Sequence, residues 1–130
     1  MNDKLIKIGV VGVGHLGKHH VKHYKTLKDI NLIGLHDINT QIGKQIANKY
    51  KIKFYKSLNT LINDIDAASI VTPTPHHFKI AKFCIKNKKH VFIEKPITVT
   101  LEEADELIKL SMKYSVIIQV GHIERLNPSL

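Results

Sequence analysis

The sequence predicts an α/β fold, a doubly wound parallel sheet, and two observations carry this prediction. Short β-branched apolar runs alternate strictly with longer amphipathic segments along the 130 residues, which is the pattern of parallel strands joined by crossover helices. The first apolar run ends in a glycine-rich turn, as expected where the first strand of such a sheet leads into its helix. Six strands and five right-handed crossovers then predict the strand order 3-2-1-4-5-6.

Each predicted strand is a run rich in Val, Ile and Leu, which is typical of parallel strands buried on both faces. The six strands are expected at residues 5–11, 31–36, 53–55, 67–72, 90–94 and 116–120. Because the strands are parallel, their carboxyl ends should meet at one edge of the sheet. Ligands of doubly wound folds bind outside that edge.

The predicted helices follow capping signals and helical periodicity. Thr40 is expected to cap the second helix, Pro75 suits the first turn of the fourth, and Thr100 with Glu103 forms a capping box for the fifth. The helices are expected at residues 15–27, 40–50, 57–63, 75–87 and 100–114. They should cover both faces of the sheet.

Apolar spacing predicts which helix faces are buried. The first helix carries Leu16, His20, Tyr24 and Leu27 on one face, and the last helix carries a stripe of Leu101, Ala104 and Ile108. On this spacing we expect His20 to be a packed core histidine rather than a ligand. Cys84 lies mid-helix beside apolar residues and is expected to pack in the core.

The segment 12–17 reads G-x-G-x-x-G, and it follows a strand and opens a helix, which is the context that gives this motif meaning. Gly12 allows the tight turn, Gly14 lets the backbone approach a pyrophosphate, and Gly17 lets the helix pack closely. The helix N-terminus offers free N–H groups to phosphates. Asp37 ends the second strand, where a carboxylate accepts hydrogen bonds from ribose hydroxyls and repels a 2′-phosphate. The sequence therefore predicts a dinucleotide site that favours NAD over NADP.

Charge and composition exclude several classes of protein. Twenty Lys and Arg residues, of which only Arg125 is arginine, stand against 11 Asp and Glu, but the lysines are scattered, aromatics are 6% and Trp is absent. Nucleic-acid readers favour Arg and interleaved aromatics, so the basic balance indicates a solvated lysine-rich surface or a field that attracts an anionic ligand. No apolar run is long enough for a bilayer, and the lone cysteine and the absence of a secretion signal at the N-terminus predict a cytoplasmic protein.

The histidines invite a metal-site hypothesis. His15, His19 and His23 recur at helical spacing, yet no carboxylate or cysteine accompanies them, and His15 falls in the phosphate turn. We therefore expect no metal site. His15 and Leu16 are instead expected to contact the cofactor at the turn.

Four segments in order resemble the glucose–fructose oxidoreductase/inositol dehydrogenase/MocA family of NAD(P)-dependent sugar oxidoreductases. They are the glycine-rich turn with His20 three residues beyond it, 71–77 (VTPTPHH), 90–96 (HVFIEKP) and 121–128 (GHIERLNP). The resemblance covers essentially the whole chain and implies a Rossmann domain. At one position, Asn87, the family usually has Gly, and Asn is the next best residue for a left-handed helix cap.

The resemblance implies roles for residues of the middle segments. Thr72 and Pro73 would line the nicotinamide side of the site, and His77 would cap or line the cleft. Glu94 would touch the nicotinamide ribose or orient Lys95. Lys95 would stand beside the substrate hydroxyl and handle its proton as hydride leaves for the cofactor.

The final segment bears on the substrate. The resemblance implies a cis bond before Pro96 and places His122 and Arg125 at the mouth of the substrate cleft. Residues 120–128 look most like the nucleotide-sugar members of the family, among them enzymes that oxidise the 3-hydroxyl of UDP-N-acetylglucosamine. A basic surface suits such an anionic substrate.

The resemblance implies that the chain holds one of the family's two domains. Residues 1–120 would form the NAD-binding domain, and 121–130 would begin the connection to an α+β substrate domain that this chain lacks. The chain alone is then expected to bind NAD without efficient turnover, and to self-associate or pair with a chain that carries the other domain. The alternatives are a stand-alone NAD-binding module or sensor, and a nucleic-acid binder, which steeply salt-dependent affinity would reveal.

Overall fold

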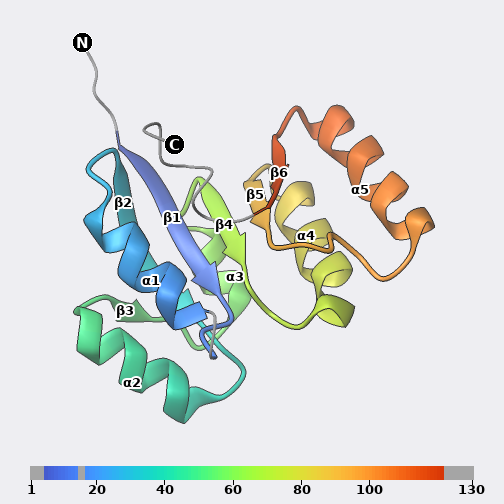
Figure 1. Ribbon diagram of the computed structural model, residues 1–130. Helices are drawn as coiled ribbons and strands as arrows, with labels where there is room; N and C mark the ends of the chain where they lie inside the picture. Colours follow the sequence, from blue (N-terminus) through green and yellow to red (C-terminus); the bar gives the residue numbers. More distant parts are fainter. Residues whose placement is uncertain (1–4, 15–16, 122–130) are drawn as a thin grey trace.

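The computed structural model describes residues 5–14 and 17–121. Six parallel strands form one sheet in the order β3-β2-β1-β4-β5-β6, which confirms the predicted doubly wound fold (Figure 1). The strands are β1 (Ile6–Val11), β2 (Ile30–His36), β3 (Lys53–Phe54), β4 (Ala67–Ile70), β5 (His90–Ile93) and β6 (Ile118–Val120). They begin within two residues of the predicted positions, and the order reverses between β1 and β4.

Helices follow the strands in alternation. They are α1 (Gly17–Thr26), α2 (Thr40–Tyr50), α3 (Leu58–Ile62), α4 (His77–Lys86) and α5 (Leu101–Tyr114), with a 3-10 turn at Thr74–His76 before α4. Pro75 was expected in the first turn of the fourth helix. It lies instead in the 3-10 turn that precedes α4. Within the described part of the chain, no helix is long and apolar enough to cross a membrane.

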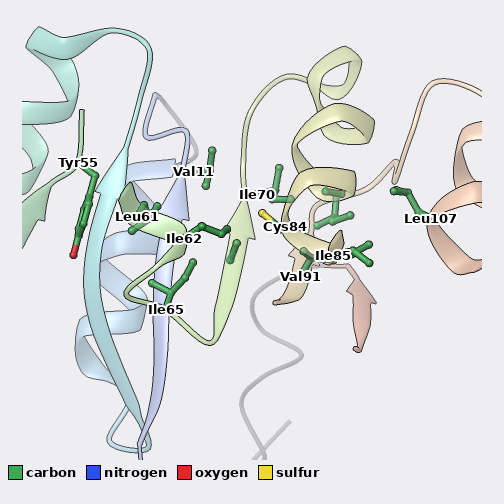
Figure 2. Close-up of a cluster of buried hydrophobic side chains, with 13 residues drawn as sticks. Val11, Tyr55, Leu61, Ile62, Ile65, Ile70, Cys84, Ile85, Val91 and Leu107 are labelled. Atoms are coloured by element: carbon green, nitrogen blue, oxygen red, sulfur yellow. The ribbon is translucent and has the colours of Figure 1, made fainter. Parts of the chain in front are cut away.

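The core lies in two layers, one on each face of the sheet. On one face, α1 and α2 contribute Val21, Tyr24 and Ala47 to a cluster with strand residues such as Val10 and Phe92. On the other face, α3, α4 and α5 contribute to a second cluster, part of which Figure 2 shows. Neighbouring strand residues alternate between the two clusters, because successive side chains of a strand point to opposite faces.

Cys84 of α4 is fully buried in the second cluster, as the sequence predicted (Figure 2). Burial raises the pKa of its thiol to about 12, with a smaller opposing effect from the positive charge of Lys89. The thiol is therefore protonated at neutral pH, and its role in the described structure is packing.

Two helix ends differ in detail from the predictions, and a third agrees with them. The N-cap of α2 is Asn39, not Thr40, because the Asn39 side chain accepts a hydrogen bond from the Ile42 N–H at 3.1 Å. The left-handed residue after α4 is Lys88, with φ 63°, and not Asn87. The Thr100 cap of α5 is confirmed, since its hydroxyl accepts from the Glu103 N–H at 3.1 Å.

The predicted apolar stripe of α5 is wrong. Leu101 is 82% exposed and Ile108 47% exposed, whereas Leu107 is fully buried against α4 (Figure 2). Helix α5 carries a second set of apolar residues, and that set packs on α4 at the outer side of the molecule (Figure 1). An ion pair of 2.8 Å between Lys82 and Glu106 also joins α4 and α5.

Replacing Leu107 by Ala should lower the free energy of unfolding by about 2–5 kcal/mol, since it removes a fully buried side chain and leaves a cavity. Leu101→Ala is the matched control on the same helix, and its change should stay within about 0.5 kcal/mol because the side chain is exposed. Urea denaturation followed by circular dichroism measures both. Equal losses for the two variants would contradict the assigned face of α5.

Candidate functional site

The carboxyl ends of four strands are aligned at one edge of the sheet. Strand pairing sets Val11 opposite both His36 and Ile70, and Ile70 opposite Ile93. The chain therefore leaves β1, β2, β4 and β5 at the same level. The residues that follow these strands include most of the site residues predicted from the sequence.

A cleft of about 910 Å³ opens over this edge. Its volume lies in the range of about 300–1,000 Å³ that is typical of small-molecule and cofactor sites. The predicted site residues that line it are Gly12, Gly14, Asp37, Thr72, Pro73, His77, Glu94 and Lys95. The structure thus brings together eight predicted residues from four separate segments.

Two glycines of the first turn have the geometry that the motif requires. Gly12 has φ +92°, a conformation that side chains disfavour. A Cβ on Gly17 would lie 2.1 Å from the Gly12 carbonyl oxygen, so α1 can begin this close to β1 only with glycine. The helix N-terminus is thereby brought against the end of the first strand.

Asp37 is held in place by the backbone on both sides. Its Oδ2 accepts a hydrogen bond from the Val13 N–H at 2.8 Å, and its Oδ1 accepts from the Asn39 N–H at 2.7 Å. The carboxylate thus joins the end of β2 to the glycine-rich turn. A carboxylate oxygen has two lone pairs, so each oxygen can accept a further hydrogen bond from a ligand.

His77 joins the two loops that carry the other predicted residues. Its Nε2 lies 2.8 Å from the Thr72 carbonyl oxygen, and its Nδ1 lies 3.0 Å from the Pro96 carbonyl oxygen and 3.2 Å from that of Ile97. The ring is buried, with 2% exposure, at the first residue of α4. The side chain therefore fixes the loop after β4 relative to the loop after β5, which contains the cis Lys95–Pro96 bond.

Glu94 is paired with His20 of α1. The Nε2 of His20 lies 3.1 Å from Oε2 of Glu94, and the two side chains are only 6% and 16% exposed. His20 is buried, as the sequence predicted, but it also has an ionisable partner at the site, which the prediction of core packing missed. The position of His20, three residues after Gly17, was the sequence feature that could have indicated a contact at the site.

A second polar contact lies beside this pair. The ring centroids of His20 and Tyr24 are 6.3 Å apart, and the Tyr24 hydroxyl donates to Oγ of Ser69 at 3.1 Å. Burial raises the pKa of Tyr24 well above its usual value, and the charge of Glu94 raises it further, while the Ser69 hydrogen bond opposes the shift. The hydroxyl stays protonated and donates.

Several residues line the cleft that the sequence analysis did not assign to it. Beside Asp37, Ile38 is 91% exposed, and the start of α3 contributes residues 57–59 to the same side. Lys79 of α4 adds a positive charge. The position of Ile38 directly after Asp37 was the sequence feature that could have indicated its place at the cleft, whereas nothing local marked the start of α3.

Four predicted residues lie outside the part of the chain that the structure describes: His15, Leu16, His122 and Arg125. Their assignment to cofactor and substrate stays a prediction. Among the described residues, no group of three or more His, Cys, Asp or Glu side chains could hold a metal ion.

The cleft fits a dinucleotide in two respects. A Cβ built on Gly14 meets nothing within 4 Å, so a ligand has space to approach the protein backbone at this position. The Thr72 hydroxyl oxygen is buried at the cleft and has no hydrogen-bond partner among the described residues, and such a group requires a partner. With the aligned strand ends and the glycine-rich turn, these features define a dinucleotide-binding domain of the Rossmann class.

Comparison with known sequences specifies the family. A family model described as "Oxidoreductase family, NAD-binding Rossmann fold" matches residues 6–122. The chain belongs to this family, the Gfo/Idh/MocA oxidoreductases. The resemblance drawn from the four sequence segments is confirmed.

The chain is similar to several characterised members. It is 36% identical over 125 residues to UDP-N-acetylglucosamine 3-dehydrogenase of Acidithiobacillus ferrooxidans, a match that covers 96% of this chain and 39% of the relative. It is 32% identical over 123 residues to myo-inositol 2-dehydrogenase of Thermotoga maritima, covering 92% of this chain and 37% of that enzyme. A solved structure of the Acidithiobacillus enzyme superposes with a TM-score of 0.86 at 35% identity, covering 95% of this chain and 40% of that one. The chain therefore spans about two fifths of the length of these relatives.

Replacing His77 by Ala should lower the free energy of unfolding by about 2–4 kcal/mol, because it removes a buried ring that contacts the carbonyl oxygens of both loops and opens a cavity. His76→Ala is the matched control, an exposed neighbour that also lines the cleft, and should cost less than about 0.5 kcal/mol. Chemical denaturation measures both. Comparable stability of the two variants would mean that His77 does not hold the loops together.

Proposed function

We propose that this chain is the cofactor-binding half of an NAD-dependent dehydrogenase that oxidises a hydroxyl of a sugar or nucleotide sugar. The observation that carries the proposal is the meeting of the glycine-rich turn, Asp37, Thr72, Glu94 and Lys95 around one cleft. The family assignment supports NAD binding. The names of the relatives support a dehydrogenase acting on a polyol or nucleotide sugar.

The orientation of the cofactor follows from the fold. Gly14 and the N-terminus of α1 would take the pyrophosphate. Asp37 lies at the end of β2, so the adenosine ribose would bind on that side of β1, where the carboxylate favours NAD over NADP. The nicotinamide half would then lie on the other side, over the ends of β4 and β5. Thr72, Pro73 and Glu94 are the residues there that would contact it.

Lys95 is the residue that we assign to the proton. Its side chain lines the cleft directly after Glu94, on the nicotinamide side. Bound NAD supplies the hydride acceptor. The Lys95 ammonium would hydrogen-bond the substrate oxygen, and the neutral amine would accept the hydroxyl proton as that oxygen becomes a carbonyl.

We further propose that UDP-N-acetylglucosamine or a related nucleotide sugar is the substrate. The 36% identity to the Acidithiobacillus enzyme supports this choice, and the net charge of +9 suits an anionic substrate. The relatives are more than twice as long. We therefore propose that 1–120 forms the NAD domain, that 121–130 begins a connection to a substrate domain, and that turnover requires that domain. The buried thiol of Cys84 suits the reducing cytoplasm that we propose as its location.

Calorimetry with NAD and NADP tests the proposal. The chain should bind NAD more tightly than NADP, and Asp37→Ala should weaken NAD binding by about 10- to 100-fold through loss of charged hydrogen bonds to ribose. The same change should narrow the NAD-to-NADP preference, because it removes the repulsion of the 2′-phosphate. Failure to bind either nucleotide would overturn the proposal for this chain.

The ratio of the NAD affinity to the NADP affinity distinguishes a direct contact of Asp37 with the cofactor from a structural effect on the glycine-rich turn. Asp37 also fixes the glycine-rich turn through the Val13 N–H, so a purely structural loss would weaken NAD and NADP alike. Lys109→Ala on α5, an exposed lysine outside the cleft, controls for general charge attraction. NAD binding with no NADH formation from any sugar nucleotide, even with a substrate domain supplied, would favour a binding module or sensor.

A further inference from the structure

The buried pair of His20 and Glu94 has no explanation in the fold alone. A carboxylate that is only 16% exposed loses most of its hydration, and pairing it with a histidine that is 6% exposed seldom gains stability over an apolar contact. Apart from the Tyr24–Ser69 hydrogen bond, apolar side chains such as the fully buried Val21 pack on this side of α1. A pair placed there at such a cost calls for a role at the cleft, which Glu94 lines.

The position of His20 is coupled to the phosphate end of the site. His20 lies in the first turn of α1, three residues after Gly17, whose close contact with Gly12 fixes the start of that helix. The imidazole Nε2 lies 3.1 Å from Oε2 of Glu94, the residue that follows β5 on the other side of the strand order reversal. One short helix segment thus connects the pyrophosphate turn to the carboxylate on the nicotinamide side.

We infer that His20 is a positioning residue that holds the Glu94 carboxylate toward the nicotinamide riboside. The inference rests on the proposed function, and it deepens that proposal by adding a residue that does not itself touch the cofactor. The Nε2–H of His20 donates to Glu94 as a hydrogen bond in the neutral ring and as an ion pair in the protonated ring. Either form restricts the Glu94 side chain, so fewer conformations are lost when a ribose hydroxyl binds.

The two halves of the cofactor give the test its readout. ADP contains the adenosine and the pyrophosphate, whereas NAD adds the nicotinamide riboside. A residue that positions Glu94 should affect NAD binding and leave ADP binding unchanged. A residue that merely supports the fold should affect both.

The experiment measures Kd for NAD and ADP by calorimetry on the whole chain and on two variants of His20. His20→Leu fills the space without a donor and should weaken NAD about 10-fold, with ADP within about twofold. His20→Gln places an amide donor near the position of Nε2 and should recover most of the loss. Combining His20→Leu with Glu94→Gln should weaken NAD no more than Glu94→Gln alone, because the two residues act as a unit.

Tyr24→Phe is the matched control. It removes the hydroxyl that donates to Ser69 from the same helix, one turn further on, and leaves the His20–Glu94 contact in place. Both Kd values should stay within about twofold of the unsubstituted chain. A loss of NAD affinity equal to that of His20→Leu would indicate general loosening of α1 and would overturn the inference.

The outcomes separate this inference from the proposed function. If the unsubstituted chain binds neither NAD nor ADP, the proposed function fails and the inference fails with it. If it binds both and His20→Leu changes neither, or weakens both equally, the cofactor site stands and the positioning role is wrong. Absence of rescue by His20→Gln would likewise overturn the role of a donor at this position.

Discussion

The structure depends on the alignment of four parallel strand ends. Pairing of Val11 with His36 and Ile70, and of Ile70 with Ile93, brings the chain out of the sheet at one level four times. A slip of one residue in any strand would reverse its side chains between the two core layers, so burial on both faces enforces the register. The position of the cleft is therefore a consequence of core packing.

Polar side chains hold together the loops that follow the aligned strand ends. Asp37 joins the loop after β2 to the glycine-rich turn, and His77 joins the loops after β4 and β5. Asp37 and His77 both contact backbone groups. They therefore fix the loops, while the side chains of the neighbouring cleft residues stay available to a ligand. Pre-organised loops lose less conformational entropy when a ligand binds.

Alternation and glycine spacing predicted the sheet order, the glycine-rich turn and Asp37, because they are local patterns with one common solution. The family resemblance supplied the other cleft residues, which are Thr72, Pro73, His77, Glu94 and Lys95. Prediction from the sequence failed where two local solutions compete. Helix α5 offers two apolar stripes, and only packing against α4 selects the one with Leu107. Asn39 and Thr40 are both good caps, and the hydrogen bond to Ile42 decides between them. The His20–Glu94 contact joins residues 74 positions apart (94 − 20), a pairing that periodicity within one helix cannot reveal.

Cys84 gives this fold a built-in reporter of its own opening. It is the single cysteine of the chain, it lies fully buried between α4 and the sheet, and its thiol pKa is raised to about 12. A thiol reagent can reach it only after α4 separates from the sheet, and only the opened chain offers an ordinary thiolate for reaction. Labelling rates would then measure how often α4, which begins at His77, separates from the sheet, and no engineered cysteine would be needed.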